Sequence, residues 1–160
     1  MGVHHEYDIA LDWTDPNGTR SYSSYTRDHQ VRAAGKAHAI EASSPERFRG
    51  SPTRYSPGEL LTAAISSGHM MRFLEVSSQV GLVVLEYRDH AHGLAELGSR
   101  GDGAVNCCVL RPRLVVRQGP FANDVEVARL HERAQSMSVI ATSVSLEVQV
   151  QPAGLEVVPA

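Results

Sequence analysis

Residues 56–74 of the chain read SPGELLTAAISSGHMMRFL, and this stretch decides the fold. Ser56 is a preferred N-cap residue, Pro57 suits the first helical position, and Glu59 stands at the capping-box position. The apolar residues that follow recur at helical spacing: Leu60, Leu61, Ala64, Ile65, Met71 and Leu74. The sequence therefore predicts a long, mostly buried helix that starts at this cap, runs to about residue 80 and stops at Gly81.

Gly68 lies near the middle of this predicted helix. Glycine in a helix interior is about 1 kcal/mol less favourable than alanine, so helix stability does not explain its presence. Two explanations remain open at this point: close packing of the helix against a neighbour, or space left for a ligand.

Length and composition describe an ordinary globular chain. The 160 residues are 42% apolar and 21% charged, with a net charge of −3, which gives no indication of nucleic-acid binding. No apolar run approaches the roughly 20 residues of a membrane span, and residues 1–5 carry no signal-peptide core. We expect a cytoplasmic protein that binds neither membrane nor nucleic acid.

Strand patterns flank the helix on both sides. Before it, alternation over residues 6–13 predicts a strand, a turn signal lies at 15–18, and further strands are predicted through Tyr22 and Tyr25 and over 31–40. Residues 43–57 have the composition of a loop.

After the helix, the patterns predict a strand over 82–97 that bends at 90–93, a turn over 98–103, and a strand over 104–116 that bends at Pro112. A second helix over 124–135, capped by Asp124, and a last strand over 143–151 follow. Strand runs mixed with two helices predict one α+β domain over residues 1–160, in which helices pack on an antiparallel-rich sheet.

Several short motifs, in order along nearly the whole chain, resemble those of the OsmC/Ohr family of organic hydroperoxide reductases. They are YTRDH (25–29), FRG (48–50), YSPGELL (55–61), SSGHM (66–70), LRP (110–112) and IATSV (140–144). The resemblance implies the OsmC-like fold: an intertwined homodimer in which sheets wrap two long central helices and both sites lie at the interface.

The resemblance also implies a thiol peroxidase cycle, which this sequence does not support. In the family a reactive cysteine attacks the peroxide, a second cysteine resolves the sulfenic acid, and a glutamate orients an arginine that activates the thiol. The reactive cysteine falls at Gly68, the resolving cysteine at Ser138, the glutamate at Gly58 and an accompanying histidine at Gln135. Only Arg27 is retained, so the family reaction is chemically unavailable at these positions.

The remaining polar groups suggest a site for a small organic molecule. His69 titrates near neutral pH and suits general acid–base chemistry, and Arg27 suits a bidentate contact with an anion. We take His69, Arg27 and Glu59 as candidate catalytic residues, and as candidate substrate-binding residues Gly58, Thr62, Gly68, Met70, Met71 and Ser138.

Each candidate also has a structural interpretation, which the sequence leaves open. His69 is either a hydrogen-bonded structural histidine or an acid–base group. Arg27 either forms an ion pair with Glu59 or contacts a ligand. Glu59 is most simply a capping residue.

The cysteines and histidines give no cofactor or metal prediction. Cys107 and Cys108 are adjacent, so on a strand they point to opposite faces, and they are most simply small buried apolar residues. His90 and His92 share a strand face, but no nearby ligands complete a metal site. We expect neither metal nor cofactor.

Three functions therefore compete. The first is a cysteine-free relative that binds a small organic substrate in a homodimer and transforms it by non-redox acid–base chemistry. The second is a non-catalytic ligand-binding or resistance protein. The third is peroxide reduction through Cys107 or Cys108.

Overall fold

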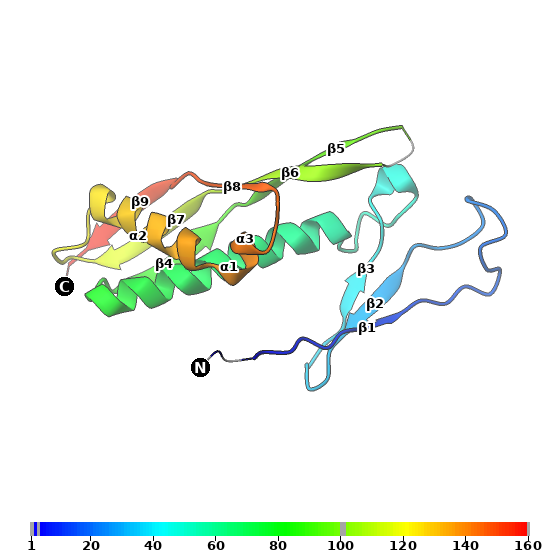
Figure 1. Ribbon diagram of the computed structural model, residues 1–160, viewed down its shortest axis with the longest axis horizontal. Helices are drawn as coiled ribbons and strands as arrows, with labels where there is room; N and C mark the ends of the chain where they lie inside the picture. The colour runs from blue at the N-terminus through cyan, green and yellow to red at the C-terminus, as the bar shows by residue number, and fades with distance from the viewer. Residues whose placement is uncertain (1, 3, 100–101, 160) are drawn as a thin grey trace. The chain divides into compact units, whose positions relative to one another are not determined.

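The computed structural model describes residues 2, 4–99 and 102–159. The chain divides into two compact units, Met1–Leu60 and Leu61–Ala160. Figure 1 traces their helices and strands in chain order. The mixture of small sheets and few helices confirms the predicted α+β class.

The first unit holds one small antiparallel sheet in the order β1-β2-β3. Its elements are β1 (Ala10–Asp12), β2 (His29–Arg32), β3 (Ile40–Ala42) and the short 3-10 helix η1 (Glu46–Phe48). Few of its side chains are buried, and large apolar ones are exposed, such as Tyr7, Ile9 and Leu11.

Three strand predictions for this unit were wrong in detail. Of the strand predicted over residues 6–13, only β1 forms. The strand predicted through Tyr22 and Tyr25 is a set of turns, because Ser21 and Ser24 bond to each other instead of to a sheet: Ser24 N donates to Ser21 O (3.1 Å), and Ser21 N donates to Ser24 Oγ (3.0 Å). The strand predicted over 31–40 is two strands, since a turn separates the end of β2 from the start of β3.

Helix α1 (Pro57–Val80) confirms the prediction made from residues 56–74. The Ser56 N–H donates to Glu59 Oε2 (2.7 Å), and the Glu59 N–H reaches Ser56 Oγ (3.4 Å), which together form the expected capping box. Gly81 ends the helix with φ +82°, a conformation that favours glycine.

The second unit contains two three-stranded sheets, ordered β4-β7-β9 and β5-β6-β8. In both, the first pair is antiparallel and the second parallel. The strands are β4 (Val84–Asp89), β5 (His92–Leu97), β6 (Gly103–Leu110), β7 (Pro112–Arg117), β8 (Glu147–Val150) and β9 (Gly154–Val158).

Each of the two predicted long strands is divided, at or next to the predicted bend, into two strands that belong to different sheets. Residues 90–91 separate β4 from β5, and Arg111 separates β6 from β7. The predicted turn over 98–103 includes residues 100–101, which lie outside the described residues.

Two more helices complete the unit: α2 (Asp124–Met137) and α3 (Val139–Thr142). Asn123, and not Asp124, caps α2, because its side chain accepts from the Glu126 N–H at 3.1 Å. The predicted strand over 143–151 shortens to β8, and β9 was not predicted.

Helices α1 and α2 cover the same face of the β4-β7-β9 sheet (Figure 1). The core between them joins residues from both helices and from the strands: Phe73, Val76, Leu82, Leu114, Val116, Val127, Leu130 and Ala134. A second, smaller cluster around Ile65, Cys108 and Leu110 lies between the first half of α1 and β6. Both clusters place the middle of α1 in a buried environment.

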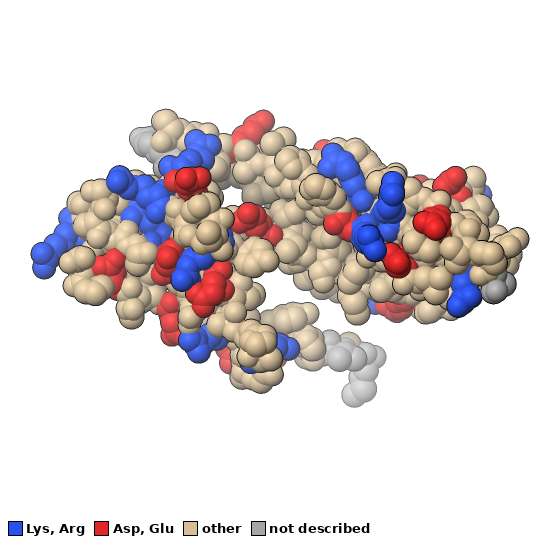
Figure 2. Space-filling view, turned by 180° about the vertical axis from the view of Figure 1, so that it is seen from behind, with Lys and Arg blue, Asp and Glu red and all other residues tan. Residues whose placement is uncertain are grey.

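Charge is mixed on the surface. Figure 2 shows acidic and basic side chains interspersed on the face in view, with neither sign dominating. None of the helices in the described part of the chain has the length and apolar character that crossing a bilayer requires.

Candidate functional site

Gly68 and Ser138 lie against each other, although they are far apart in sequence. A Cβ built on Gly68 would stand 3.4 Å from Ser138 Oγ and 3.2 Å from Ile140 Cγ1. Ser138 is 1% exposed and caps α3, where its Oγ accepts from the Ala141 N–H. The space beside Gly68 is therefore occupied by Ile140 and Ser138 of the same chain.

His69, the next residue of α1, pairs with a histidine of α2. Its Nε2 lies 2.9 Å from Nδ1 of His131, and the two rings are nearly parallel, with an interplanar angle of 12°. Phe73 stacks on His131 with ring centroids 4.0 Å apart. His69 is 1% and His131 2% exposed, so the pair is enclosed between the helices.

Burial keeps both imidazoles neutral. Loss of solvent lowers the pKa of His69 below its usual value, and the negative charge of Asp89 opposes this in part. Burial, followed by the neighbouring His69, lowers the pKa of His131 to about 3. Near neutral pH the pair consequently shares one N–H···N hydrogen bond between two uncharged rings.

Asp89, at the end of β4, is the charged group that acts on the pKa of His69, and two donors hold it in place. The Ser66 hydroxyl donates to Oδ2 (2.5 Å), and the Arg111 N–H donates to Oδ1 (2.6 Å). Burial, and then Asp89, raise the pKa of the Tyr87 hydroxyl, which therefore stays protonated. The arrangement places one fixed carboxylate beside a neutral histidine pair.

Sequence reasoning did not identify His131 and Asp89 as site residues. His131 lies on the apolar face of the predicted second helix, and a histidine on such a face is the signal that could have selected it. Asp89 is the last residue of β4, where Tyr87 and Asp89 are partly buried and Arg88 between them is exposed. This alternation is a weaker signal of a site residue.

The other predicted binding residues of α1 lie in different environments. Thr62 is half-buried and approaches Gly93, since a Cβ on Gly93 would stand 2.3 Å from Thr62 Oγ1. Met70 is half-buried, whereas Met71 is 61% exposed. A Cβ on Gly58, in the first turn, would meet no atom of the described residues within 4 Å. Of the predicted set, the structure joins Gly68, His69 and Ser138 in one buried region.

Arg27 and Glu59 belong to the first unit, where each has structural contacts. The Arg27 guanidinium stacks over the rings of Tyr22 (4.6 Å) and Tyr25 (3.9 Å) and donates to the carbonyls of both residues. Hydrogen bonds from the Ser56 N–H and hydroxyl lower the pKa of Glu59. Within the described residues these two side chains form no ion pair with each other.

The two cysteines are free thiols on β6. Cys108 is buried with Ile65 and Leu110, and burial, followed by Asp89, raises its pKa, so its reactive thiolate form is disfavoured. Cys107 is partly exposed. No group of three or more potential metal ligands occurs within residues 2, 4–99 and 102–159.

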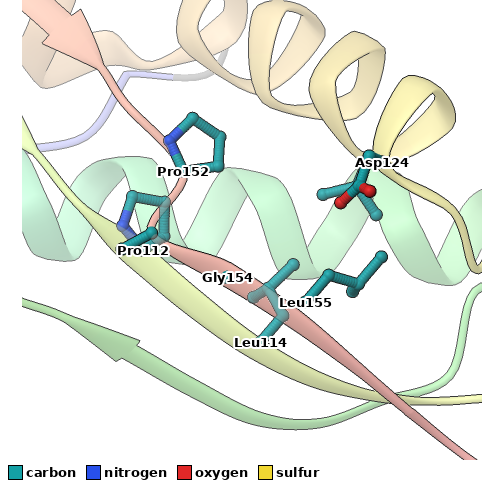
Figure 3. Close-up of a pocket in the computed structure, with 8 residues that line it drawn as sticks. Pro112, Leu114, Asp124, Pro152, Gly154 and Leu155 are labelled. Carbon is teal, nitrogen blue, oxygen red and sulfur yellow. The ribbon is translucent and has the colours of Figure 1, made fainter.

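A separate pocket of about 400 Å³ opens between β7, the start of β9 and the first turn of α2. Figure 3 shows Asp124 at the start of the helix, above Leu114 and Leu155, with Pro112 and Pro152 further along the strands. Asp124 is the one charged residue among those that line it. This pocket does not include His69 or His131.

Of the comparisons with known proteins, the search of solved structures found similar proteins. A scan against protein-family models gave no match, and a search of curated proteins gave none either. Among solved structures, the chain is similar to an OsmC-like protein of unknown function from Vibrio cholerae, with a TM-score of 0.79, 27% identity and coverage of 93% of this chain and 99% of that one.

Two organic hydroperoxide resistance proteins are similar at lower identity. One, from Elizabethkingia anophelis, has a TM-score of 0.64 at 14% identity and covers 96% of this chain and 99% of its own. The other, described as putative and from Vibrio cholerae, has a TM-score of 0.68 at 19% identity and covers 95% of both chains. The likeness to the OsmC-like protein, together with the ordered motifs, supports membership of the OsmC/Ohr family, and the likenesses at lower identity show the OsmC-like fold.

Proposed function

We propose that this chain is an OsmC-like protein without thiol peroxidase chemistry, which binds a small organic molecule and transforms it by non-redox acid–base chemistry. The observation that carries the proposal is the buried region where Gly68 meets Ser138 and His69 pairs with His131. The family's two cysteines map to Gly68 and Ser138, so the positions that lie in contact here contain no sulfur.

The reactive-thiol step has no substitute in this region. Glycine offers no nucleophile, and a serine cannot resolve a sulfenic acid as a disulfide. The raised pKa of Cys108 disfavours the thiolate that attack on a peroxide requires. Peroxide reduction through Cys107 or Cys108 is therefore the least supported of the three functions.

Acid–base chemistry has a candidate group in His69. A neutral imidazole can accept a proton at one nitrogen and donate one from the other, which suits isomerisation, cyclisation, dehydration or hydrolysis. A related putative organic hydroperoxide resistance protein from Vibrio cholerae holds captopril in one of its active sites, which supports a small organic ligand on this fold. Arg27 remains a candidate contact for an anionic group, on the chemistry of its guanidinium alone.

We propose that the working form is a homodimer. In the first unit Tyr7 is 77%, Leu11 68% and Ile9 57% exposed, and apolar exposure of this extent is characteristic of a surface that another chain covers. The family resemblance points to a second copy of this chain. We expect the molecular mass in solution to be twice that of one chain.

Deep burial of His69 favours one alternative, a non-catalytic ligand-binding or resistance protein. A side chain that is 1% exposed reaches a substrate only if the site opens or the partner reshapes it. In a carrier, His69 would hold a bound molecule by a hydrogen bond without turning it over.

Mass spectrometry of small-molecule extracts incubated with the protein tests the proposal. We expect one compound to be converted to an isomer, or to gain or lose one water, and His69→Gln to slow this conversion by about 10²–10⁴-fold, the usual contribution of general acid–base catalysis. The matched control is His92→Gln, which removes an exposed histidine of β5.

Conversion at the wild-type rate by His69→Gln would exclude this residue from the mechanism. A compound that is retained by the wild-type protein but never altered would support the ligand-binding alternative.

A further inference from the structure

The hydrogen bond between His69 and His131 constrains the other two nitrogens of the rings. Two neutral imidazoles carry two N–H groups between them, and one of these forms the bond between Nε2 and Nδ1. The remaining atoms, Nδ1 of His69 and Nε2 of His131, are buried and have no hydrogen-bond partner among the described residues. One of them must carry a hydrogen and the other a lone pair.

We propose that His131 is the positioning residue of His69 and that the two rings work as one proton relay. This inference rests on the proposed function, because it assigns how His69 acts as an acid or base. The bond to His131 fixes the ring orientation of His69, and Phe73 stacked on the far ring holds that partner in place.

The relay conserves protons and charge. In one state His131 Nδ1–H donates to His69 Nε2, His69 Nδ1 carries a hydrogen, and His131 Nε2 is bare. A hydronium ion delivers a proton to His131 Nε2 and leaves as water, the shared hydrogen moves to His69 Nε2, and the proton on His69 Nδ1 passes to the substrate. Both rings remain neutral, and His69 Nδ1 has changed from donor to acceptor.

The groups that surround the pair suit this role. On β4, the Asp89 carboxylate interacts with His69, and the Tyr87 hydroxyl stays protonated. On α1, Phe73 contributes an apolar ring on which His131 is stacked. Asp89 is held by Ser66 and by the Arg111 N–H, so the charge that acts on His69 is fixed.

Nitrogen NMR on histidine-labelled dimer tests the relay without any substrate. We expect a scalar coupling across the hydrogen bond between His69 Nε2 and His131 Nδ1. At pH 7 we also expect one of the two outer nitrogens to be protonated and the other bare, or both to report the average of these two states. The coupling should disappear in His131→Gln and persist in the matched control His92→Gln.

Absence of the coupling in the wild-type protein, or full protonation of both outer nitrogens at pH 7, would overturn the relay. These measurements separate the two proposals. An intact coupling with unchanged turnover in His69→Gln would refute the proposed function of His69, and the relay with it, while leaving the hydrogen-bonded pair in place. A missing coupling with lost turnover in His69→Gln would refute the relay alone.

Discussion

Lowering the pH from 7 to 5 is expected to reduce the free energy of unfolding by about 2 kcal/mol through His131 alone. The pKa of His131 is about 3 in the folded chain against an ordinary 6.5, because the ring is buried beside His69. Between these two values the unfolded chain binds more protons than the folded one. Stability from this source is therefore complete above about pH 6.5 and is lost as the pH falls towards 3. The lowered pKa of His69 acts in the same direction.

Urea denaturation at pH 7, 6 and 5, at one protein concentration, measures this loss. His131→Gln should lose less stability over the same range, because the residue that titrates differently in the two states is gone. His92→Gln should retain the wild-type slope, since His92 is exposed. Identical pH dependence in the wild-type protein and His131→Gln would contradict the buried neutral pair.

Introducing cysteines at both Gly68 and Ser138 is expected to produce a disulfide. A Cβ at residue 68 would lie 3.4 Å from the side-chain oxygen of Ser138. In a disulfide, each Cβ lies about 3 Å from the partner sulfur, so a small shift suffices. The bridge would close a loop of about 70 residues, for which chain entropy predicts about 4 kcal/mol of stabilisation. Non-reducing electrophoresis and thermal unfolding with and without reductant measure both effects.

The matched control for this bridge is Ser67→Cys with Ser138→Cys. Ser67 is the preceding residue on the same helix but is exposed, so this pair should stay reduced. Because Ile140 Cγ1 stands 3.2 Å from the new Cβ, the bridge should form more completely when Ile140→Ala, which removes that atom, is added. Equal bridging from positions 67 and 68 would contradict the placement of Gly68 against Ser138.

Local rules were sufficient to predict the long helix. The cap at Ser56, the apolar spacing and the end of the helix at Gly81 each depend only on residues a few positions away in the sequence. The interruptions of the two long strands near residues 90–91 and Arg111 could also be predicted from the sequence, because histidine, glycine and proline break the strand patterns there.

Tertiary contacts decided what the sequence did not predict. Strand β9 depends on parallel pairing with β7, a partner about 40 positions earlier in the chain, as the register Arg113 to Gly154 shows. The predicted strand through Tyr22 and Tyr25 gave way to turns in which serine side chains bond the backbone. In both cases hydrogen bonds, to a distant strand or to nearby serine side chains, decide the local structure. The periodicity of apolar residues alone does not predict which of these bonds form.

The same limit applies to the site. His69 was selected because it follows Gly68 in the helix, but the hydrogen bond to His131 spans 62 positions and joins two helices. Asp89 comes close only because β4 packs beside α1. A single sequence gives the residue types of such a cluster and the elements that carry them, whereas their distances follow from packing.

Consumption of an organic hydroperoxide, with dithiothreitol or a lipoyl compound as reductant, tests the central claim most directly. The wild-type chain should consume the peroxide no faster than a variant with Cys107→Ser and Cys108→Ser, because Gly68 and Ser138, where the family resemblance implies the two cysteines, carry no thiol. Rapid consumption that this variant abolishes would show that a thiol of β6 performs the family reaction and would contradict the account.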